Sequence, residues 1–217
     1  MAFFKVSTAA DAIKDSGTGG NFISKSGIYD VTIKTVSVAQ NDKGARSLNF
    51  NVDYNGNEQV FYGLTLDNND GTANYKANIF NKLCIIAGIA DVEEPEIETH
   101  ILGKDKVATD LQVLTQFSDL AVKVKIQNVY SEYQGAIRES KEIRGFYRAE
   151  DGASAAEIFN GAEPKQYEKD LETTKDILKD VTEEQVVTFL ANRSKGGSAP
   201  VSRPAAAKPT ANPFARK

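Results

Sequence analysis

The sequence predicts a mainly β fold in which a three-stranded meander, a helix and a two-stranded hairpin follow one another. Three observations support this order. Apolar and polar residues alternate in five segments between residues 27 and 148, as they do in half-buried strands. Residues 74–87 instead carry apolar side chains at helical spacing. Asn55-Gly56 and Gly135 stand where tight turns are needed, and these residue types tolerate a positive φ angle.

The first predicted strand begins at Gly27 and is bent. Its apolar side chains alternate from Tyr29 to Ile33, and the phase then slips to Val36. Such a slip indicates a β-bulge, at which one extra residue kinks a strand. Residues 41–44 form the turn that we predict after it.

The second and third strands are predicted to form a hairpin. The second, residues 48–54, has the most regular alternation in the chain, and Asn55-Gly56 suits the type I′ turn that follows. The third covers residues 59–66. We expect Val60, Tyr62, Leu64 and Leu66 on one face and an exposed Phe61, with Gly63 and Thr65, on the other. A slip of one residue in register would reverse this assignment.

The helix at residues 74–87 is expected to end at Gly88 and to pack on the sheet. Cys84 lies within its apolar face. We therefore expect a buried and unreactive thiol, because a nucleophilic cysteine needs an accessible, electropositive setting.

Residues 91–110 are acidic, with seven Asp or Glu against two Lys, and Pro95 breaks any helix there. His100 stands alone in this segment, and we assign it no chemistry. A short helix is expected at residues 111–117.

A long hairpin from Leu120 to Arg148 supplies the fourth and fifth strands. It carries six Lys or Arg against three Glu, in a chain whose formal net charge is −4. Its aromatic residues lie among these charges: Tyr130, Tyr133, Phe146 and Tyr147. Such a surface suits phosphates and unstacked bases.

Five strands with a helix between the third and the fourth are the plan of an OB-fold, a small Greek-key barrel. We therefore expect a five-stranded OB-fold barrel, followed by C-terminal helices and a disordered tail. The predicted parts of the chain are an N-terminal arm (1–26), the OB-fold domain (27–148), an acidic helical extension (149–194) and a basic tail (195–217).

The extension is expected to contain three helices. They cover residues 154–159, 165–178 and 182–192, and Thr182 with Gln185 forms a capping box at the start of the last one.

OB-folds bind oligonucleotides across strands two and three and the loops after strands one and four. The residues expected there or along the basic hairpin are Lys43, Arg46, Asn49, Phe61, Tyr62, Lys123, Lys125, Tyr130, Tyr133, Arg138, Lys141 and Arg144. The cations would neutralise phosphates, and each aromatic would stack a base with roughly 1–3 kcal/mol. The predicted function is sequence-tolerant, non-catalytic binding of single-stranded DNA, with no cofactor.

Four segments also resemble bacteriophage single-stranded DNA-binding proteins of the OB-fold type. They are residues 26–31, 62–64, 79–83 and 87–88, within a resemblance that spans roughly residues 22–148. The resemblance implies a protein that coats and protects single strands in phage DNA replication, recombination or repair. It also implies a location in the cytoplasm of the infected bacterial host.

The resemblance further implies contacts with replication or recombination proteins. Pro213-Phe214 is similar to the end of the partner-binding tails of such proteins, although basic rather than acidic residues surround it here. The acidic helices before the tail are the alternative partner surface. The oligomeric state stays open, with a homo-oligomer among the alternatives.

Composition limits the other function classes. One Cys and one His exclude an intrachain disulfide framework and a structural zinc site of Cys and His ligands, and we expect no membrane-spanning segment. A nuclease would need clustered carboxylates for metal ions, and only Asp67 and Asp70 form such a pair in a plausible loop. The remaining alternative is a protein-interaction module, which salt-sensitive DNA binding would argue against.

Overall fold

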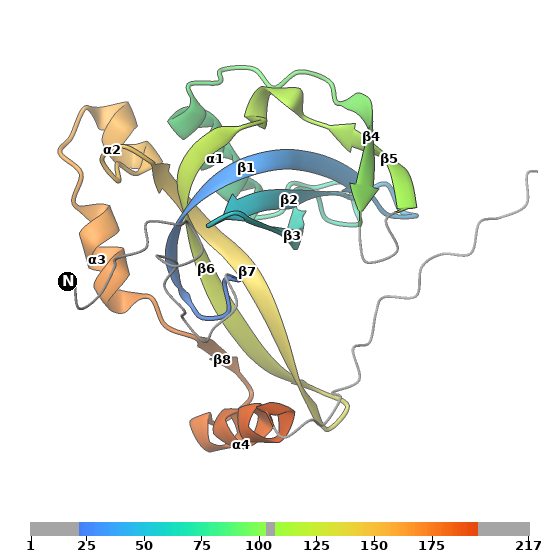
Figure 1. The fold of residues 1–217 in the computed structure, drawn as a ribbon, viewed down its shortest axis with the longest axis vertical. Helices are drawn as coiled ribbons and strands as arrows, with labels where there is room; N and C mark the ends of the chain where they lie inside the picture. The colour runs from blue at the N-terminus through green and yellow to red at the C-terminus, as the bar shows by residue number, and fades with distance from the viewer. Residues whose placement is uncertain (1–21, 103–106, 195–217) are drawn as a thin grey trace, which may run out of the picture. The chain divides into compact units, whose positions relative to one another are not determined.

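The computed structural model describes residues 22–102 and 107–194 (Figure 1). Eight strands in this part of the chain form one sheet, which confirms the mainly β class with additional helices. The chain divides into two compact units. The first contains residues 22–102, 107–129 and 139–177, and the second contains residues 130–138 and 178–194.

The predicted meander is present. The strands β1 (Gly27–Gln40), β2 (Arg46–Tyr54) and β3 (Asn57–Thr65) pair antiparallel in this order. β1 is long enough to serve two neighbours, and its first half also pairs with β6 (Leu120–Tyr133). The predicted bulge is confirmed, because the register between β1 and β2 shifts between Ile33 and Thr35. Both Ile33 and Val36 therefore reach the core.

The helix α1 (Ala77–Ala87) lies where it was expected and ends at Gly88, whose φ of 70° places it in the left-handed region. Leu83 and Cys84 are buried in the core cluster of the sheet, which confirms that the helix packs there. Burial raises the pKa of the Cys84 thiol, in agreement with an unreactive side chain.

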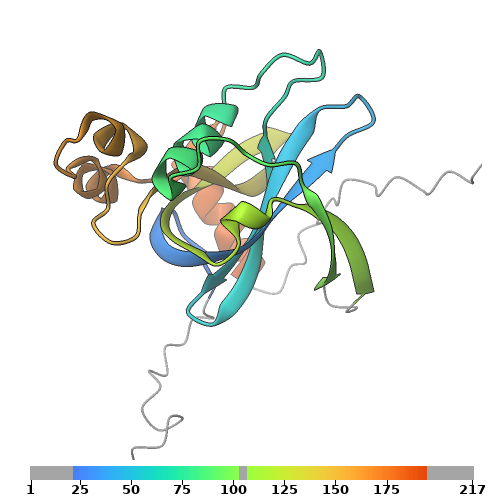
Figure 2. The ribbon, with the colours of Figure 1, turned by 90° about the horizontal axis from the view of Figure 1, so that it is seen from above.

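Two strands occur where none was predicted. β4 (Glu96–Leu102) and β5 (Val107–Val113) form an antiparallel hairpin, and β5 also pairs with β1 through Ser37. Seen from above, this hairpin and α1 lie on different sides of the meander (Figure 2). The expected helix at residues 111–117 is reduced to one 3₁₀ turn, Thr115–Phe117. Hydrophobic alternation did not reveal the hairpin because most of its side chains stay outside the core.

The predicted long hairpin is confirmed as β6 and β7 (Ala136–Arg148). Gln134 and Gly135 close it with φ angles of 54° and 76°. The closed barrel is wrong, however. β7 pairs only with β6 among the described strands, so the sheet stays open between β3 and β7.

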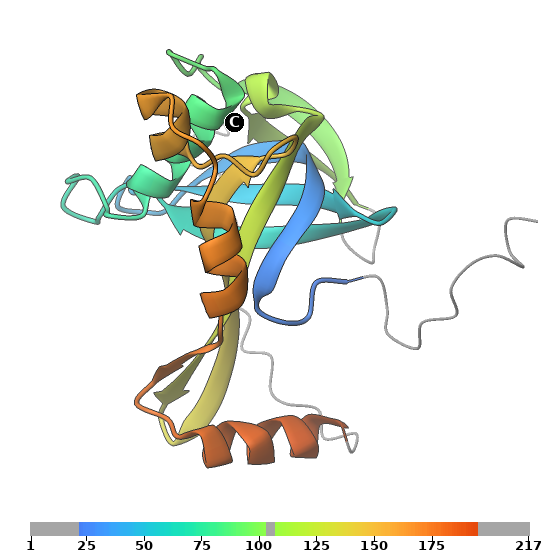
Figure 3. The ribbon, with the colours of Figure 1, turned by 90° about the vertical axis from the view of Figure 1, so that its left-hand side faces the viewer.

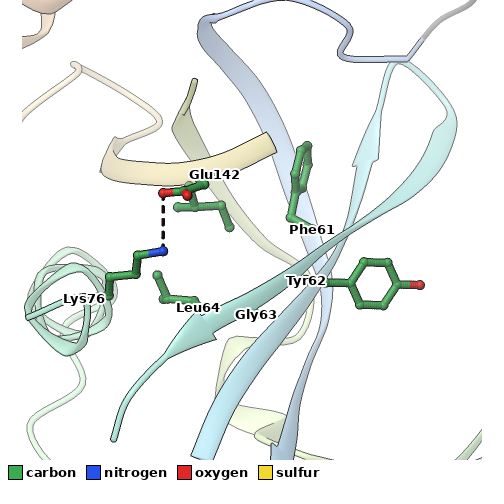
Figure 4. Close-up of a pocket in the computed structure, with 7 residues that line it drawn as sticks. Phe61, Tyr62, Gly63, Leu64, Lys76 and Glu142 are labelled. Carbon is green, nitrogen blue, oxygen red and sulfur yellow. Dashed lines mark ion pairs between the residues drawn. The ribbon is translucent and has the colours of Figure 1, made fainter. Parts of the chain in front are cut away.

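A physical reason for the gap is visible between these two strands (Figure 4). The ion pair between Lys76 and Glu142, 3.3 Å long, lies there beside a cavity of about 20 Å³. The cavity is lined from β3 by Phe61 to Leu64 and from β7 by Glu142 and Ile143. Side chains and this small cavity thus occupy the space between β3 and β7.

The C-terminal extension contains the first and last predicted helices, but the predicted helix at residues 165–178 is shorter and a short strand follows it. α2 (Ala155–Asn160), α3 (Gln166–Thr173), the short strand β8 (Ile177–Lys179) and α4 (Glu183–Ser194) follow β7. The capping box of α4 is confirmed, because Gln185 N donates to Thr182 Oγ1 and Thr182 N donates to Gln185 Oε1. Within the first unit, α3 lies beside β6, and its Asp170 pairs with Lys125 of β6 (Figure 3). None of the described helices is both long and apolar enough to span a membrane.

Candidate nucleic-acid interface

A groove of about 170 Å³, with both polar side chains and apolar surface in its lining, opens on the sheet of the first unit. The meander strands and the β4–β5 hairpin supply its walls. Its lining residues are Thr35, Ser37, Asn49, Asn51, Val60, Tyr62, His100 and Leu111. The volume is below the roughly 300–1,000 Å³ of pockets that enclose drug-sized ligands, so the groove suits a single planar ring of a longer ligand.

Tyr62 is the most exposed side chain of this groove, with 76% of its surface accessible. It projects away from the cavity that Phe61 and Leu64 line (Figure 4). A flat, accessible aromatic ring beside polar groups is the usual platform for stacking an unpaired base.

The predicted face of Phe61 is wrong. Phe61 is buried in the core, with 5% of its surface exposed, and its neighbour Tyr62 is exposed instead. The cause is a bulge in β3. Phe50 pairs with Phe61 and Leu48 pairs with Leu64, so two residues, Tyr62 and Gly63, lie opposite one residue of β2.

Gly63 makes this bulge possible because its φ is 77°. Its amide donates a hydrogen bond of 3.0 Å to Oδ1 of Asn49, which fixes the Asn49 side chain at the groove. The bulge therefore positions both Tyr62 and Asn49, two of the predicted site residues.

Asn51 supplies a second amide to the groove. Its Nδ2 donates to Glu58 Oε2 over 2.9 Å, whereas its Oδ1 is buried and lacks a hydrogen-bond partner among the described residues. This buried acceptor leaves one hydrogen-bonding capacity of the Asn51 amide unused.

His100 also lines the groove, and its Nε2 lies 2.7 Å from Oε2 of Glu98. Together with Thr35 and Ser37, it was not among the predicted site residues. His100 comes close to the two β1 residues only because the β4–β5 hairpin packs beside β1. The local sequence pattern did not predict this packing.

Four of the basic residues predicted on the long hairpin already have polar partners. Lys123 pairs with Asp30 over 2.5 Å and Lys125 pairs with Asp170 over 3.1 Å. Both ammonium side chains are largely covered, with 16% and 17% of their surface exposed. Contact of either side chain with a phosphate would require exchange of its present acidic partner, and the predicted role stays a prediction.

Lys141 and Arg144 are engaged in the same way. Lys141 Nζ donates to the carbonyl oxygen of Ile23 over 2.6 Å, and Arg144 lies 3.1 Å from Glu142. Both are half-buried, and their role as phosphate contacts stays a prediction.

Of the two cations predicted after the first strand, one is paired. Arg46 binds Asp67 through two nitrogen atoms, over 2.6 and 3.2 Å, and this contact lowers the pKa of Asp67. Lys43 is exposed in the turn between β1 and β2.

Asp70, the second carboxylate of the loop that contains Asp67, accepts a hydrogen bond from Thr72 Oγ1. Among the residues with described positions, no three or more His, Cys, Asp or Glu gather as metal ligands.

The second unit contains the tip of the long hairpin. Arg138 lies over the ring of Tyr133, 3.8 Å from its centroid, and Tyr133 is half exposed. Tyr130 was predicted at an open loop, but it is buried within strand β6 and packs edge-on against Phe189 of α4. That prediction is wrong because the strand continues to Tyr133.

Two further predictions lie outside the described residues. They are residues 1–21 of the N-terminal arm and the tail with Pro213 and Phe214.

Neither a scan against protein-family models nor a search of the curated proteins finds a match to this chain. The assignment of a function therefore depends on the groove and on the chemistry of its side chains.

Proposed function

We propose that the protein binds single-stranded DNA without catalysis, with the groove of the first unit as its base-contacting site. The observation that carries the proposal is the exposed ring of Tyr62 next to the amides of Asn49 and Asn51 on one face of the sheet. Stacking depends little on base identity, so binding through Tyr62 would tolerate different sequences.

In this mechanism the bases of a single strand lie across β2 and β3. One base stacks on Tyr62, beside the side chains of Asn49 and Asn51. Lys43 and the cations after residue 193 contact phosphates. A duplex would bind less well because its bases are already stacked and paired.

The biological setting follows from the resemblance and belongs to the proposal. A protein of this kind coats and protects single strands during phage replication, recombination or repair. Phage proteins of the same process would then contact the acidic extension or the tail.

Fluorescence anisotropy with a labelled oligo-dT and a duplex of equal length tests this function. We expect tight binding to the single strand, much weaker binding to the duplex, and weaker binding of both at high salt. Equal affinity for the two DNAs, or no binding, would refute the proposal.

A protein-interaction module is the second candidate. It is favoured by the pairing of the hairpin cations, which leaves fewer positive charges for DNA than the sequence indicates. Failure of DNA binding in the anisotropy experiment would leave this candidate.

A further inference from the structure

β4 forms one end of the strand order β3-β2-β1-β5-β4 (Figure 1). Within the described part of the chain, its backbone pairs with β5 on one side alone. The other side presents unpaired N–H and C=O groups, which can template pairing with another strand.

Natural proteins usually protect such edges with lysine, proline or a bulge. β3, at the opposite end of the order, contains the bulge at Gly63. β4 has none of these features. Its pairing with β5 is unbroken from Glu96 to Leu102, and neither Lys nor Pro occurs within the strand.

The edge also carries large apolar side chains in water. Ile97 and Ile101 have 75% and 70% of their surface exposed, and they lie on one face of β4 because they are four residues apart. Thr99 lies between them on the same face and donates to Asp110 over 2.7 Å. The opposite face carries Glu98 and His100.

We propose that β4 pairs antiparallel with β4 of a second copy of this chain, about a two-fold axis at Thr99. This register places Ile97 opposite Ile101 of the second copy and Glu98 opposite its His100. Apolar residues then meet apolar residues on one face, and a carboxylate meets an imidazole on the other. Each match occurs twice, as a two-fold interface requires.

The neighbouring symmetric registers lack this match. An axis at Glu98 would place two glutamates opposite each other, and an axis at His100 would do the same with two histidines. Registers in which one strand slides along the other by an odd number of residues are excluded. Residues whose N–H and C=O groups point outward would then lie opposite residues whose groups point toward β5. Of these registers, the one about Thr99 alone pairs the two isoleucines with each other and Glu98 with His100.

The pairing would extend the sheet across the two copies. Because the axis stands perpendicular to the sheet, the grooves of both copies would open on the same face. The dimer does not depend on the DNA-binding function proposed above, since it follows from the edge strand alone.

Sedimentation equilibrium of the full chain, without DNA, tests the proposal. We expect a reversible monomer–dimer equilibrium for the natural sequence. Thr99→Lys and Thr99→Glu each place like charges across the axis, and each should weaken the dimer about tenfold or more. An equimolar mixture of the two variants should associate again, because Lys then faces Glu.

Recovery of association in the mixture also shows that both variants fold. Thr109→Lys is the matched control, since Thr109 is exposed on the same hairpin but lies on β5, away from the edge. It should dimerise like the natural sequence. A monomer at every concentration, dimers unaffected by either Thr99 substitution, or no association in the mixture would each overturn the proposal.

Discussion

Phe61 and Tyr62 are adjacent aromatic residues with opposite environments. Phe61 packs in the core with Phe50 as its partner on β2, and Tyr62 stands in solvent at the groove. Because the bulge at Gly63 adds one residue to β3, both Phe61 and Leu64 face the core and Tyr62 between them faces solvent. A base-stacking role therefore belongs to Tyr62 and a packing role to Phe61.

Replacing Tyr62 with Ala should weaken binding to oligo-dT by roughly 5- to 150-fold, which corresponds to the 1–3 kcal/mol of one stacked base. Tyr62→Phe should retain most of the affinity because the ring remains. Phe159→Ala removes an aromatic side chain that is 81% exposed on α2, outside the groove, and it serves as the control. Equal losses in Tyr62→Ala and Phe159→Ala would show that Tyr62 has no specific role.

Phe61→Ala should instead lower the free energy of unfolding by about 3–5 kcal/mol, as expected for a large buried aromatic residue. Urea denaturation followed by circular dichroism measures this change. Tyr62→Ala should unfold at nearly the same urea concentration as the natural sequence. If the two substitutions destabilised the protein equally, the two side chains would not occupy the different environments described above.

At the scale of elements, one carboxylate joins the segments that follow β7. Glu157 of α2 accepts hydrogen bonds from the backbone amides of Ser154, Lys165 and Gln166. Burial alone would raise the pKa of Glu157, but these hydrogen bonds and one from the Ser154 hydroxyl outweigh it and lower the pKa to about 2. The start of α3 is thus held to α2 by the ionised form.

The ionised Glu157 should contribute to stability at neutral pH and lose this contribution on acidification. Because its folded pKa is about 2 and its ordinary value is 4.5, the contribution is complete above pH 4.5 and is lost as the pH falls toward 2. We expect Glu157→Gln to cost about 1–2 kcal/mol at pH 7 and much less near pH 2. Urea unfolding at several pH values measures the difference.

Glu163→Gln is the control for this experiment, because Glu163 is largely exposed and contacts only Lys165 across 3.4 Å in the described residues. It should change stability little at any pH. A cost for Glu157→Gln that stays constant down to pH 2 would contradict the role of the ionised form.

α3 contributes a second contact between elements. Its Asp170 accepts a hydrogen bond from the Tyr147 hydroxyl and pairs with Lys125. Burial opposes ionisation of Asp170, but the contacts with Tyr147 and Lys125 outweigh it, so the pKa of Asp170 is lowered. Burial and the same carboxylate raise the pKa of Tyr147. An acidic helix therefore neutralises part of the hairpin that the sequence indicates as basic.

For the whole molecule, the positive charges that lack acidic neighbours are not located where the sequence alone indicates. The formal net charge is −4, and several cations of the described sheet already have acidic partners. From Arg193 to the end, the sequence contains six Lys or Arg and no acid. The salt dependence of DNA binding should accordingly come largely from this last segment.

Substituting the five cations after Ser194 by Gln (Lys195, Arg203, Lys208, Arg216 and Lys217) should reduce the slope of log K against log salt. The reduction is at most roughly 3.5, from about 0.7 per phosphate contact on a single strand. Anisotropy titrations at several salt concentrations measure the slope. Lys125→Gln should leave the slope unchanged, because Asp170 already neutralises this side chain. An unaltered slope in the five-fold variant would contradict the expectation.

Local patterns in the chain were sufficient to predict the β1–β3 meander, α1 and the β6–β7 hairpin. Alternation identifies a strand with one buried face, and Asn55-Gly56 and Gly135 encode tight turns through backbone conformations that few other residues adopt. These signals depend only on neighbouring residues. The same signals could not reveal β4 and β5, whose side chains mostly stay outside the core.

Contacts between distant residues decided the rest. The bulge that exposes Tyr62 and buries Phe61 depends on pairing with β2, and the groove depends on β5 packing beside β1. Lys123 is neutralised by Asp30, 93 positions away in the sequence. Register and charge pairing of this kind are set by which strands meet, and a local pattern of residues carries no information about a partner that lies so far along the chain.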